Sequence, residues 1–319
     1  MRNFASKLAP VITEYLQQRE ILGFSDSQEK SLAMFDEYCC THHPNLETLT
    51  KESVRGWVDY ETSKGCKTMF GKVGAVRMLA QYMGGGAYIL PPKTVLPPKR
   101  CVPYILTDEE LTALFSASDN IGGNFEYAYK LMCPTLLRLM YTCGLRPSEA
   151  RLIKRSNINF DTGEILIEKT KRHKERIVVT SDDMLRQCVK YDAIRSFWCS
   201  DSEYFFAREN KEPISKDALW KVFNCCWQEA NAEVPANMLP RLRPYDLRHR
   251  FASAVLQKWL NNGRDLYAML PYLQAYMGHE NFSHTAYYIH LLPENLLNSP
   301  GIDWSRIDEV NPEVDIWKQ

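Results

Sequence analysis

The chain lacks the features that mark membrane-embedded and secreted proteins. No uncharged apolar run approaches the roughly 18 residues that span a bilayer, and the N-terminus has no long apolar core of a signal peptide. The ten cysteines include no C-x-x-C pair. In a cytosolic protein such cysteines are expected to be buried thiols rather than disulfides. The sequence therefore predicts a cytoplasmic protein with no membrane segment.

The motifs of common catalytic metal sites are missing as well. Neither a D-x-D carboxylate cluster nor H-E-x-x-H occurs. The nearest approach to a ligand set is Cys39-Cys40 beside His42-His43. Adjacent cysteines do not readily face one tetrahedral ion, and no second ligand pair follows. We therefore expect no metal and no other cofactor.

Net charge is also absent, since 39 Lys and Arg residues balance 39 Asp and Glu residues. This balance argues mildly against a nucleic-acid-binding protein, but local patches decide electrostatic attraction. Basic residues gather in stretches 169–176 and 241–250, whereas acidic residues gather at helix starts and after Asp303. The two basic stretches are therefore candidate anion-binding surfaces.

Length and hydrophobic periodicity predict two domains. At 319 residues the chain can form two cores. Residues 1–90 show helical periodicity and no strand signal, which predicts an all-α domain. Residues 105–300 are expected to form a second, α+β domain that starts with the capping box at Thr107, and 301–319 to form a tail. The predicted fold class is mainly α with a small antiparallel β-sheet.

The expected elements follow from apolar spacing, caps and turn residues. Three strands are expected within residues 156–180. Helices are expected at 4–22, from a cap at Ser25 or Asp26 to Phe35, from a cap at Thr50, and at 67–83, 125–143, 181–198, 215–230, 244–260, 265–277 and 282–292.

The linker at 91–104 is rich in proline and lysine. Its prolines favour an extended, semi-rigid backbone. Its positive charges suit a path along phosphates, although a plain spacer between domains explains the same residues.

The start of the predicted helix 244–260 carries a cluster of polar side chains. Tyr245, Arg248 and His249 lie three to four positions apart and share one face of its first turn. A guanidinium and an imidazole at a helix N-terminus form a candidate anion site, although a solvated helix start explains the same cluster.

If the second domain acts on a phosphodiester, cleavage without a metal needs three kinds of group. They are a nucleophile, cations on the non-bridging oxygens and an acid for the leaving oxygen. Arg146 and Arg248 are the candidate cations, because a planar guanidinium makes two parallel hydrogen bonds to phosphate. Lys171 is the candidate acid, and it lies in the basic stretch 169–176, at the expected turn between two of the strands. The nucleophile is sought within 278–290.

Each candidate has a plainer interpretation. Arg146 could neutralise the negative C-terminus of the preceding helix. Lys169 or Lys174 could take the place of Lys171. His279 could be a helix cap, and His284 and His290 are expected to be structural.

Four stretches in this order resemble the tyrosine recombinase (phage integrase) family. They are Gly144-Leu-Arg-Pro-Ser-Glu149, Lys171 to Arg176, Tyr245-Asp-Leu-Arg-His-Arg-Phe-Ala252, and Met277-Gly-His279 with Tyr288-Ile-His290. The resemblance covers residues 105–292, and the N-terminal helices resemble the core-binding domain of the family more loosely. The stretch 270–279 is similar to recombinases carried by transposons.

The resemblance implies a role for each matching residue. Arg146 and Arg248 would clamp the scissile phosphate, and Lys171 would protonate the departing 5′ oxygen. His279 would hydrogen-bond the phosphate, and Tyr288 would attack it to give a 3′-phosphotyrosyl link. Glu149 would support Arg146 from one turn away.

The chain departs from the family pattern in two places. Tyr245 stands where the family usually has histidine, and a phenol is a poor base near neutral pH, although it can hydrogen-bond a phosphate. The gap from Arg248 to His279 is also longer than expected. Extra turn or helix at 261–263 and 270–272 would absorb it.

Two adjacent tyrosines compete for the role of nucleophile. Neighbouring residues of an α-helix point about 100° apart, so only one of them can face the phosphate. The Tyr-x-His ending favours Tyr288 and leaves Tyr287 for core packing.

The resemblance implies a site-specific recombinase or integrase that moves or excises a mobile element. Its partner would be double-stranded DNA, bound by a homotetramer on two paired sites, with the tail docking on a neighbouring protomer and with accessory or partner recombinases as further candidates. A type IB topoisomerase-like enzyme and a catalytically quiet DNA-binding protein are the alternatives. The candidate DNA contacts are Lys67, Lys72, Arg77, Lys93, Lys99, Arg100, Arg172, Lys174 and Arg243.

Overall fold

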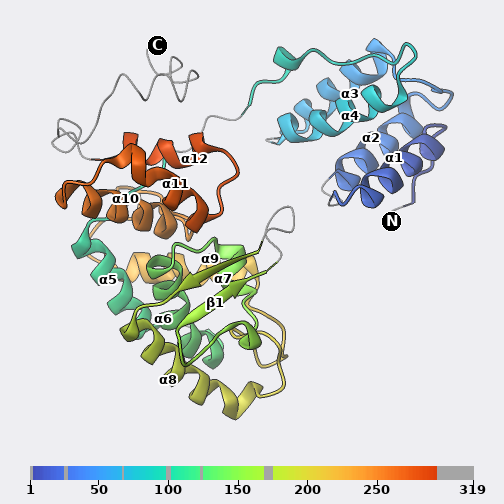
Figure 1. The fold of residues 1–319 in the computed structure, drawn as a ribbon. Coiled ribbons are helices and arrows are strands. Elements are labelled where there is room, and N and C mark those ends of the chain that lie inside the picture. The colour runs from blue at the N-terminus through green and yellow to red at the C-terminus, as the bar shows by residue number, and fades with distance from the viewer. Residues whose placement is uncertain are drawn as a thin grey trace. The chain divides into compact units, whose positions relative to one another are not determined.

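The computed structural model describes residues 3–24, 28–66, 68–97, 102–122, 125–168 and 175–292. The chain divides into two compact units, Met1–Cys101 and Val102–Gln319 (Figure 1). Within the described residues no helix is long and apolar enough to cross a membrane.

The first unit is helical. Its helices are α1 (Ala9–Ile21), α2 (Glu29–His42), α3 (Lys51–Ser63) and α4 (Met69–Met83), followed by the short 3₁₀ helix η1 (Pro92–Thr94). Their apolar faces meet in one core, in which the rings of Phe35 and Trp57 pack edge to face at 5.2 Å. The predicted cap at Thr50 is confirmed, because its hydroxyl accepts the N–H of Ser53 at 3.1 Å. The helix α2 starts after Gln28, and the predicted cap residues Ser25 and Asp26 lie outside the described residues.

The second unit combines helices with a small sheet. Its elements are α5 (Asp108–Asp119), α6 (Tyr127–Thr142), α7 (Pro147–Arg151), η2 (Arg155–Asn157), β1 (Glu164–Ile167), β2 (Arg176–Val179), α8 (Asp182–Cys199), α9 (Lys216–Ala230), α10 (Asp246–Asn261), α11 (Leu266–Met277), α12 (Phe282–Ala286) and the 3₁₀ helix η3 (Tyr287–Leu291). The capping box predicted at Thr107 opens α5, with the Thr107 N–H donating to Glu110 at 2.8 Å.

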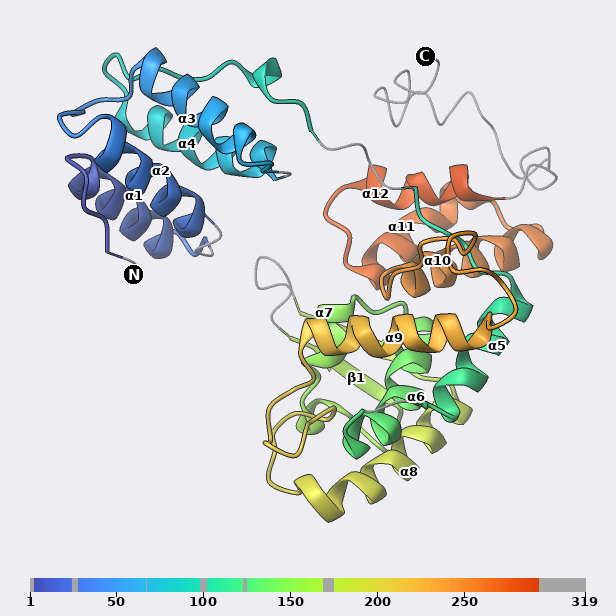
Figure 2. The same ribbon diagram turned by 180° about the vertical axis from the view of Figure 1, so that it is seen from behind.

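Two cores lie side by side in this unit. The larger one surrounds α6, whose Met132, Leu136 and Met140 are fully buried. The smaller one joins α10, α11 and η3 through residues such as Leu256 and Leu270. Figures 1 and 2 show α10, α11 and α12 grouped at one end of the unit and α6, α8 and β1 toward the other. The start of α10 contacts the ends of α6 and α11, because Arg248 donates to the carbonyls of Gly144 and Met277.

The sheet is smaller than the sequence predicts. β1 and β2 pair antiparallel, with Ile165 opposite Val178. The third strand expected near Ile158 is reduced to one bridge, from Ile158 to Ile165. The side chain of Asn159 explains the difference, because its Oδ1 accepts the N–H groups of Asp161 and Thr162 at 3.0 and 3.1 Å. Such local bonds turn the chain instead of extending it.

Two predicted helix bounds differ from the structure near the polar residues. α10 starts at Asp246 and not at Pro244, because the Asp246 carboxylate accepts the N–H of Arg243 at 2.8 Å and holds the preceding turn. The predicted helix 282–292 is α-helical only to Ala286 and continues as the 3₁₀ helix η3. Tyr288 therefore lies on the tighter helix.

Gly144 and Gly263 form a matched pair for testing how tightly Phe251 packs against the turn after α6. Both follow a helix and have positive φ, +60° and +66°. A Cβ at Gly144 would lie 2.7 Å from Cε1 of Phe251, whereas one at Gly263 would meet nothing within 4 Å. We expect Gly263→Ala to lower the free energy of unfolding by about 1 kcal/mol, and Gly144→Ala by about 2 to 4 kcal/mol because overpacking adds to the backbone term. Urea denaturation measures both, and equal losses would contradict the packing argument.

Candidate active site

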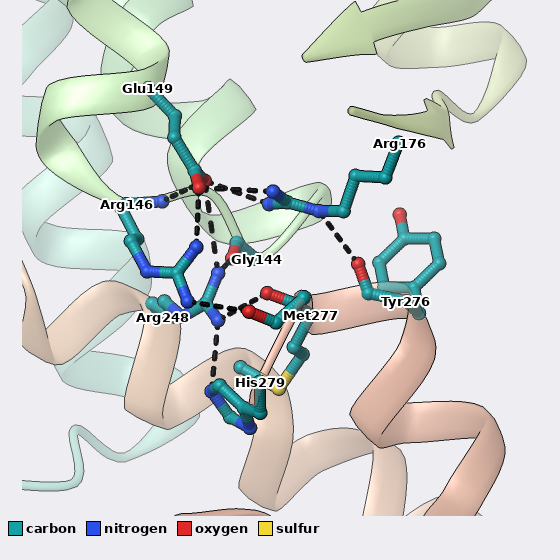
Figure 3. A network of polar contacts seen from close by, with 9 residues as sticks. Gly144, Arg146, Glu149, Arg176, Arg248, Tyr276, Met277 and His279 are labelled. Atoms are coloured by element: carbon teal, nitrogen blue, oxygen red, sulfur yellow. Dashed lines mark hydrogen bonds and ion pairs between the residues drawn. The ribbon is translucent and has the colours of Figure 1, made fainter. Parts of the chain in front are cut away.

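A buried carboxylate, that of Glu149 on α7, lies at the centre of a cluster of guanidiniums (Figure 3). It accepts hydrogen bonds from Arg146 Nη1 at 2.5 Å and from Arg176 Nη1 and Nη2 at 3.0 and 2.7 Å. Arg248 Nη1 lies 3.9 Å away. Burial alone raises the pKa of this carboxyl, but Arg176 and Arg146 outweigh burial and lower it to about 2. Glu149 is therefore ionised near neutral pH and holds the cations together.

Arg248 joins three segments that are distant in the sequence. It comes from the first turn of α10 and is 0% exposed. Its Nη1 donates to the carbonyl of Gly144 at 2.6 Å, and its Nη2 donates to the carbonyl of Met277 at 2.6 Å and to His279 Nε2 at 2.9 Å. Its Nε has no hydrogen-bond partner among the residues that the structure describes. Burial and the nearby Arg146 lower the pKa of this guanidinium.

Arg146 is the more accessible of these two arginines. It immediately precedes Pro147, the first residue of α7, and 26% of its side chain is exposed. Its Nη2 donates to the carbonyl of Gly278 at 2.8 Å. Burial lowers its pKa, but the Glu149 carboxylate and the Tyr245 phenol outweigh burial and raise it. Arg146 thus stays charged at the edge of the cluster.

The contacts of His279 define which of its ring nitrogens carries a proton. A guanidinium can only donate, so the Nε2 atom that contacts Arg248 must accept. Nδ1 then carries the hydrogen and donates it to Thr285 Oγ1 at 2.8 Å. Burial, followed by Arg248 and Arg146, lowers the pKa of this imidazole to about 3. His279 is therefore neutral in the free protein.

Tyr288 points its phenol into the same cluster. Its side chain is 2% exposed, and its Oη lies 3.1 Å from His249 Nδ1. Its ring lies parallel to that of His279, with centroids 6.0 Å apart. Burial raises the pKa of the phenol, and Arg248 offsets part of that rise.

The neighbours of Tyr288 separate the two tyrosines of η3. Tyr287 is only half-buried, and its ring centroid lies 6.3 Å from that of Tyr288. The ring centroid of Tyr245 lies 5.0 Å from that of His249. The structure therefore places Tyr288 among the basic and imidazole groups of the cluster.

The structure brings together most, but not all, of the predicted site residues. Arg146, Arg248, His279 and Tyr288 form one connected cluster, and Tyr245 borders it. Lys171 lies outside the described residues. Sequence reasoning assigned no role to Arg176, which also donates from Nε to the carbonyl of Tyr276 at 2.9 Å. Its place at the end of the basic stretch 169–176 was visible in the sequence, but the carboxylate that it pairs with was not.

The candidate DNA contacts are less well defined. Lys67, Lys99, Arg100, Arg172 and Lys174 and the side chain of Lys93 lie outside the described residues. Lys72 pairs with Glu61 at 2.8 Å, and both side chains are largely buried. Arg77 donates to the carbonyls of Leu90 and Pro91 at 2.8 and 3.3 Å, and Arg243 pairs with Asp246 at 2.8 Å. These three have intramolecular partners in the free protein.

Metal ligands do not gather at the site. Among the described residues, no group of three or more His, Cys, Asp or Glu side chains is placed to hold an ion. The polar cluster consists mainly of guanidiniums around one carboxylate, a set that attracts anions.

Comparison with known proteins identifies the family. Residues 105–295 match the model described as the phage integrase family. The chain belongs to this family of tyrosine recombinases. The tyrosine recombinase XerD of Staphylococcus aureus is 27% identical over 298 residues, which cover 88% of this chain and 94% of XerD. A Sinorhizobium fredii protein named as an integrase/recombinase, y4rE, is 26% identical over 307 residues, covering 91% and 93%.

Solved structures of recombinases share the fold. The Tn1549 transposon integrase in complex with transposon right end DNA matches with a TM-score of 0.62 and 14% identity, over 87% of this chain and 94% of that one. The XerH site-specific recombinase bound to a palindromic difH substrate matches with a TM-score of 0.61 and 17% identity, over 85% and 77%. The predicted family and the mainly helical fold class with a small antiparallel sheet are confirmed.

The bond between Arg176 and Glu149 can be tested against a surface pair. Arg176→Met should lower the free energy of unfolding by about 3 kcal/mol, because it removes one partner of a buried ion pair. Arg186→Met removes the exposed partner of Asp183 and should change the free energy of unfolding by less than about 1 kcal/mol. Urea denaturation compares the two variants. A loss in Arg176→Met no larger than in Arg186→Met would contradict the tethering role.

The buried histidines predict how stability depends on pH. The pKa values of His249 and His279 are lowered to about 4 and about 3, from about 6.5 in an unfolded chain. The unfolded state therefore binds protons first, so the stability present above about pH 6.5 is lost as the pH falls toward 4. We expect the Tm of His279→Asn to fall less steeply than that of wild type across this range and to run parallel to it above pH 7. Calorimetry over a pH series tests this, and equal slopes would refute it.

Proposed function

We propose that this protein is a site-specific DNA recombinase that cuts and rejoins DNA strands through a 3′-phosphotyrosine intermediate. The observation that carries the proposal is the position of the Tyr288 phenol, buried beside Arg248 and His279 in a cluster with an excess of positive charge. Membership of the phage integrase family supports the same chemistry. Integration or excision of a mobile element is the proposed use, in line with the structural similarity to the Tn1549 transposon integrase.

The proposed reaction starts with binding of the scissile phosphate by Arg146 and Arg248. Three guanidiniums surround one carboxylate, so the cluster attracts an anion. Arg146 is exposed enough to meet it first, and the Nε–H of Arg248, which has no partner in the part of the chain that the structure describes, can donate once the phosphate has entered. A bound anion offsets the repulsion that these cations exert on an imidazolium, which favours hydrogen-bond donation by His279.

Bond exchange then occurs at phosphorus. The Oη of Tyr288 forms a bond to phosphorus while the bond to the 5′ oxygen breaks, and Lys171 is proposed to give that oxygen its proton. The new phosphodiester link retains the energy of the old one, so a 5′ hydroxyl from another strand can reverse the reaction without a further energy source. Double-stranded DNA as substrate and a homotetramer on two paired sites are part of the proposal. Residues 1–90 would bind the DNA as a core-binding domain, and the linker 91–104 would join them to the catalytic domain at 105–300.

A nicked substrate tests the chemistry and the nucleophile together. DNA from the ends flanking the gene of this protein carries a nick that lets the 5′ fragment diffuse away, which traps the covalent intermediate. Wild type should form an SDS-resistant, protease-sensitive adduct with EDTA present. Tyr288→Phe should form none, and Tyr287→Phe should retain it because Tyr288 is the tyrosine whose phenol contacts His249 and whose ring stacks on His279.

The other outcomes would change the proposal in defined ways. An adduct that disappears only in Tyr287→Phe would move the nucleophile to that residue. Tight binding of the DNA ends by wild type without an adduct would favour a catalytically quiet DNA-binding protein.

A further inference from the structure

The attack by Tyr288 requires a group that removes its phenolic proton. The described residues around its Oη offer few acceptors. Arg248 is a guanidinium and can only donate. Both ring nitrogens of His279 are already engaged, by Arg248 and Thr285. His249, whose Nδ1 lies 3.1 Å from the Tyr288 Oη, is the one imidazole in direct contact with the phenol among the residues described.

We propose that His249 is the general base of the reaction and takes the proton of Tyr288 during attack. This inference rests on the proposed recombinase function. As the bond from Oη to phosphorus forms and the bond to the 5′ oxygen breaks, the phenolic hydrogen moves to Nδ1 and leaves an imidazolium. In rejoining, the 5′ hydroxyl bonds to phosphorus and gives its proton back to Lys171, the bond to Tyr288 Oη breaks, and His249 returns its proton to the departing phenolate. No oxidant, metal or further reactant is needed.

The surroundings of His249 suit a base that is neutral before the reaction. Its charged neighbours are Asp246 and Arg248 on α10 and Arg243 in the turn before that helix, and the phenols of Tyr245 and Tyr288 face its ring. Burial, together with the two arginines, outweighs the carboxylate and lowers the pKa of the imidazole to about 4. An unprotonated nitrogen is therefore present at neutral pH.

The same surroundings make a base necessary. Burial raises the pKa of the Tyr288 phenol, so the fraction of free phenolate near neutral pH is very small. A phenol at position 245 is a poor proton acceptor at this pH. His249 lies four residues after Tyr245, so the two side chains share one face at the start of α10. The geometry therefore assigns proton removal to position 249 and leaves Tyr245 to pack against the imidazole and contact Arg146.

The rate of adduct formation on the nicked DNA, followed in a single turnover over a pH series, tests the assignment. The wild-type rate should be nearly flat from about pH 6 to about pH 9, because the imidazole is already neutral there. His249→Ala should react about 10²-fold more slowly at pH 7. Its rate should rise about tenfold per pH unit, since it depends on the phenolate fraction. Added imidazole should restore part of the rate.

A fluorinated tyrosine at position 288 separates proton removal from positioning. Its more acidic phenol loses the proton without help, so it should largely restore the rate of His249→Ala. Thr285→Val is the matched control, because it breaks a hydrogen bond to His279 in the same cluster without removing the proposed base. It should slow the reaction with an unchanged pH profile and without rescue by the fluorinated residue.

The outcomes separate this inference from the proposed function. A wild-type adduct together with an unchanged rate in His249→Ala would overturn the base and leave the recombinase intact. So would a slow His249→Ala variant with a flat pH profile and no rescue by imidazole or fluorotyrosine, which indicates structural damage alone. Absence of a wild-type adduct despite DNA binding would overturn both.

Discussion

The contact of one buried carboxylate with several guanidiniums determines how the rest of the site is arranged. Arginines placed this close repel one another, and burial strengthens the repulsion by removing water. Glu149 compensates with short bonds to Arg146 and Arg176 and lies within 3.9 Å of Arg248. Charge compensation is incomplete, because one carboxylate faces three cations. The cluster therefore keeps an excess of positive charge.

Helix ends supply the remaining compensation. The last carbonyls of a helix carry partial negative charge and lack intrahelical partners. The carbonyls of Met277 and Gly278, where α11 ends, accept hydrogen bonds from Arg248 and Arg146, and the carbonyl of Gly144 after α6 accepts another from Arg248. Both glycines adopt positive φ, which lets each helix stop where its carbonyls face the cations. The backbone conformation at these two glycines therefore also determines which carbonyls lie against the arginines.

The sequence predicted local chemistry better than long-range contacts. The caps at Thr50 and Thr107 and the glycine after α6 follow from short motifs, and the order of the arginine, histidine and tyrosine motifs indicated the family. The partner of Arg176 could not be predicted, since it lies on another element 27 positions away. The third strand was predicted wrongly because the turn made by the Asn159 side chain competes with strand pairing.

The contact between His249 and Tyr288 shows why a motif alone does not settle a mechanism. Both residues lie in motifs that the sequence made visible, yet their 3.1 Å contact joins positions 39 residues apart. It depends on the smaller core, in which Leu256, Leu270 and Ile289 pack α10, α11 and η3 together. That core fixes the distance from imidazole to phenol, whereas the carboxylate network fixes the cations. Under the proposed mechanism, substitutions in the smaller core should affect proton removal, whereas substitutions in the carboxylate network should affect phosphate binding.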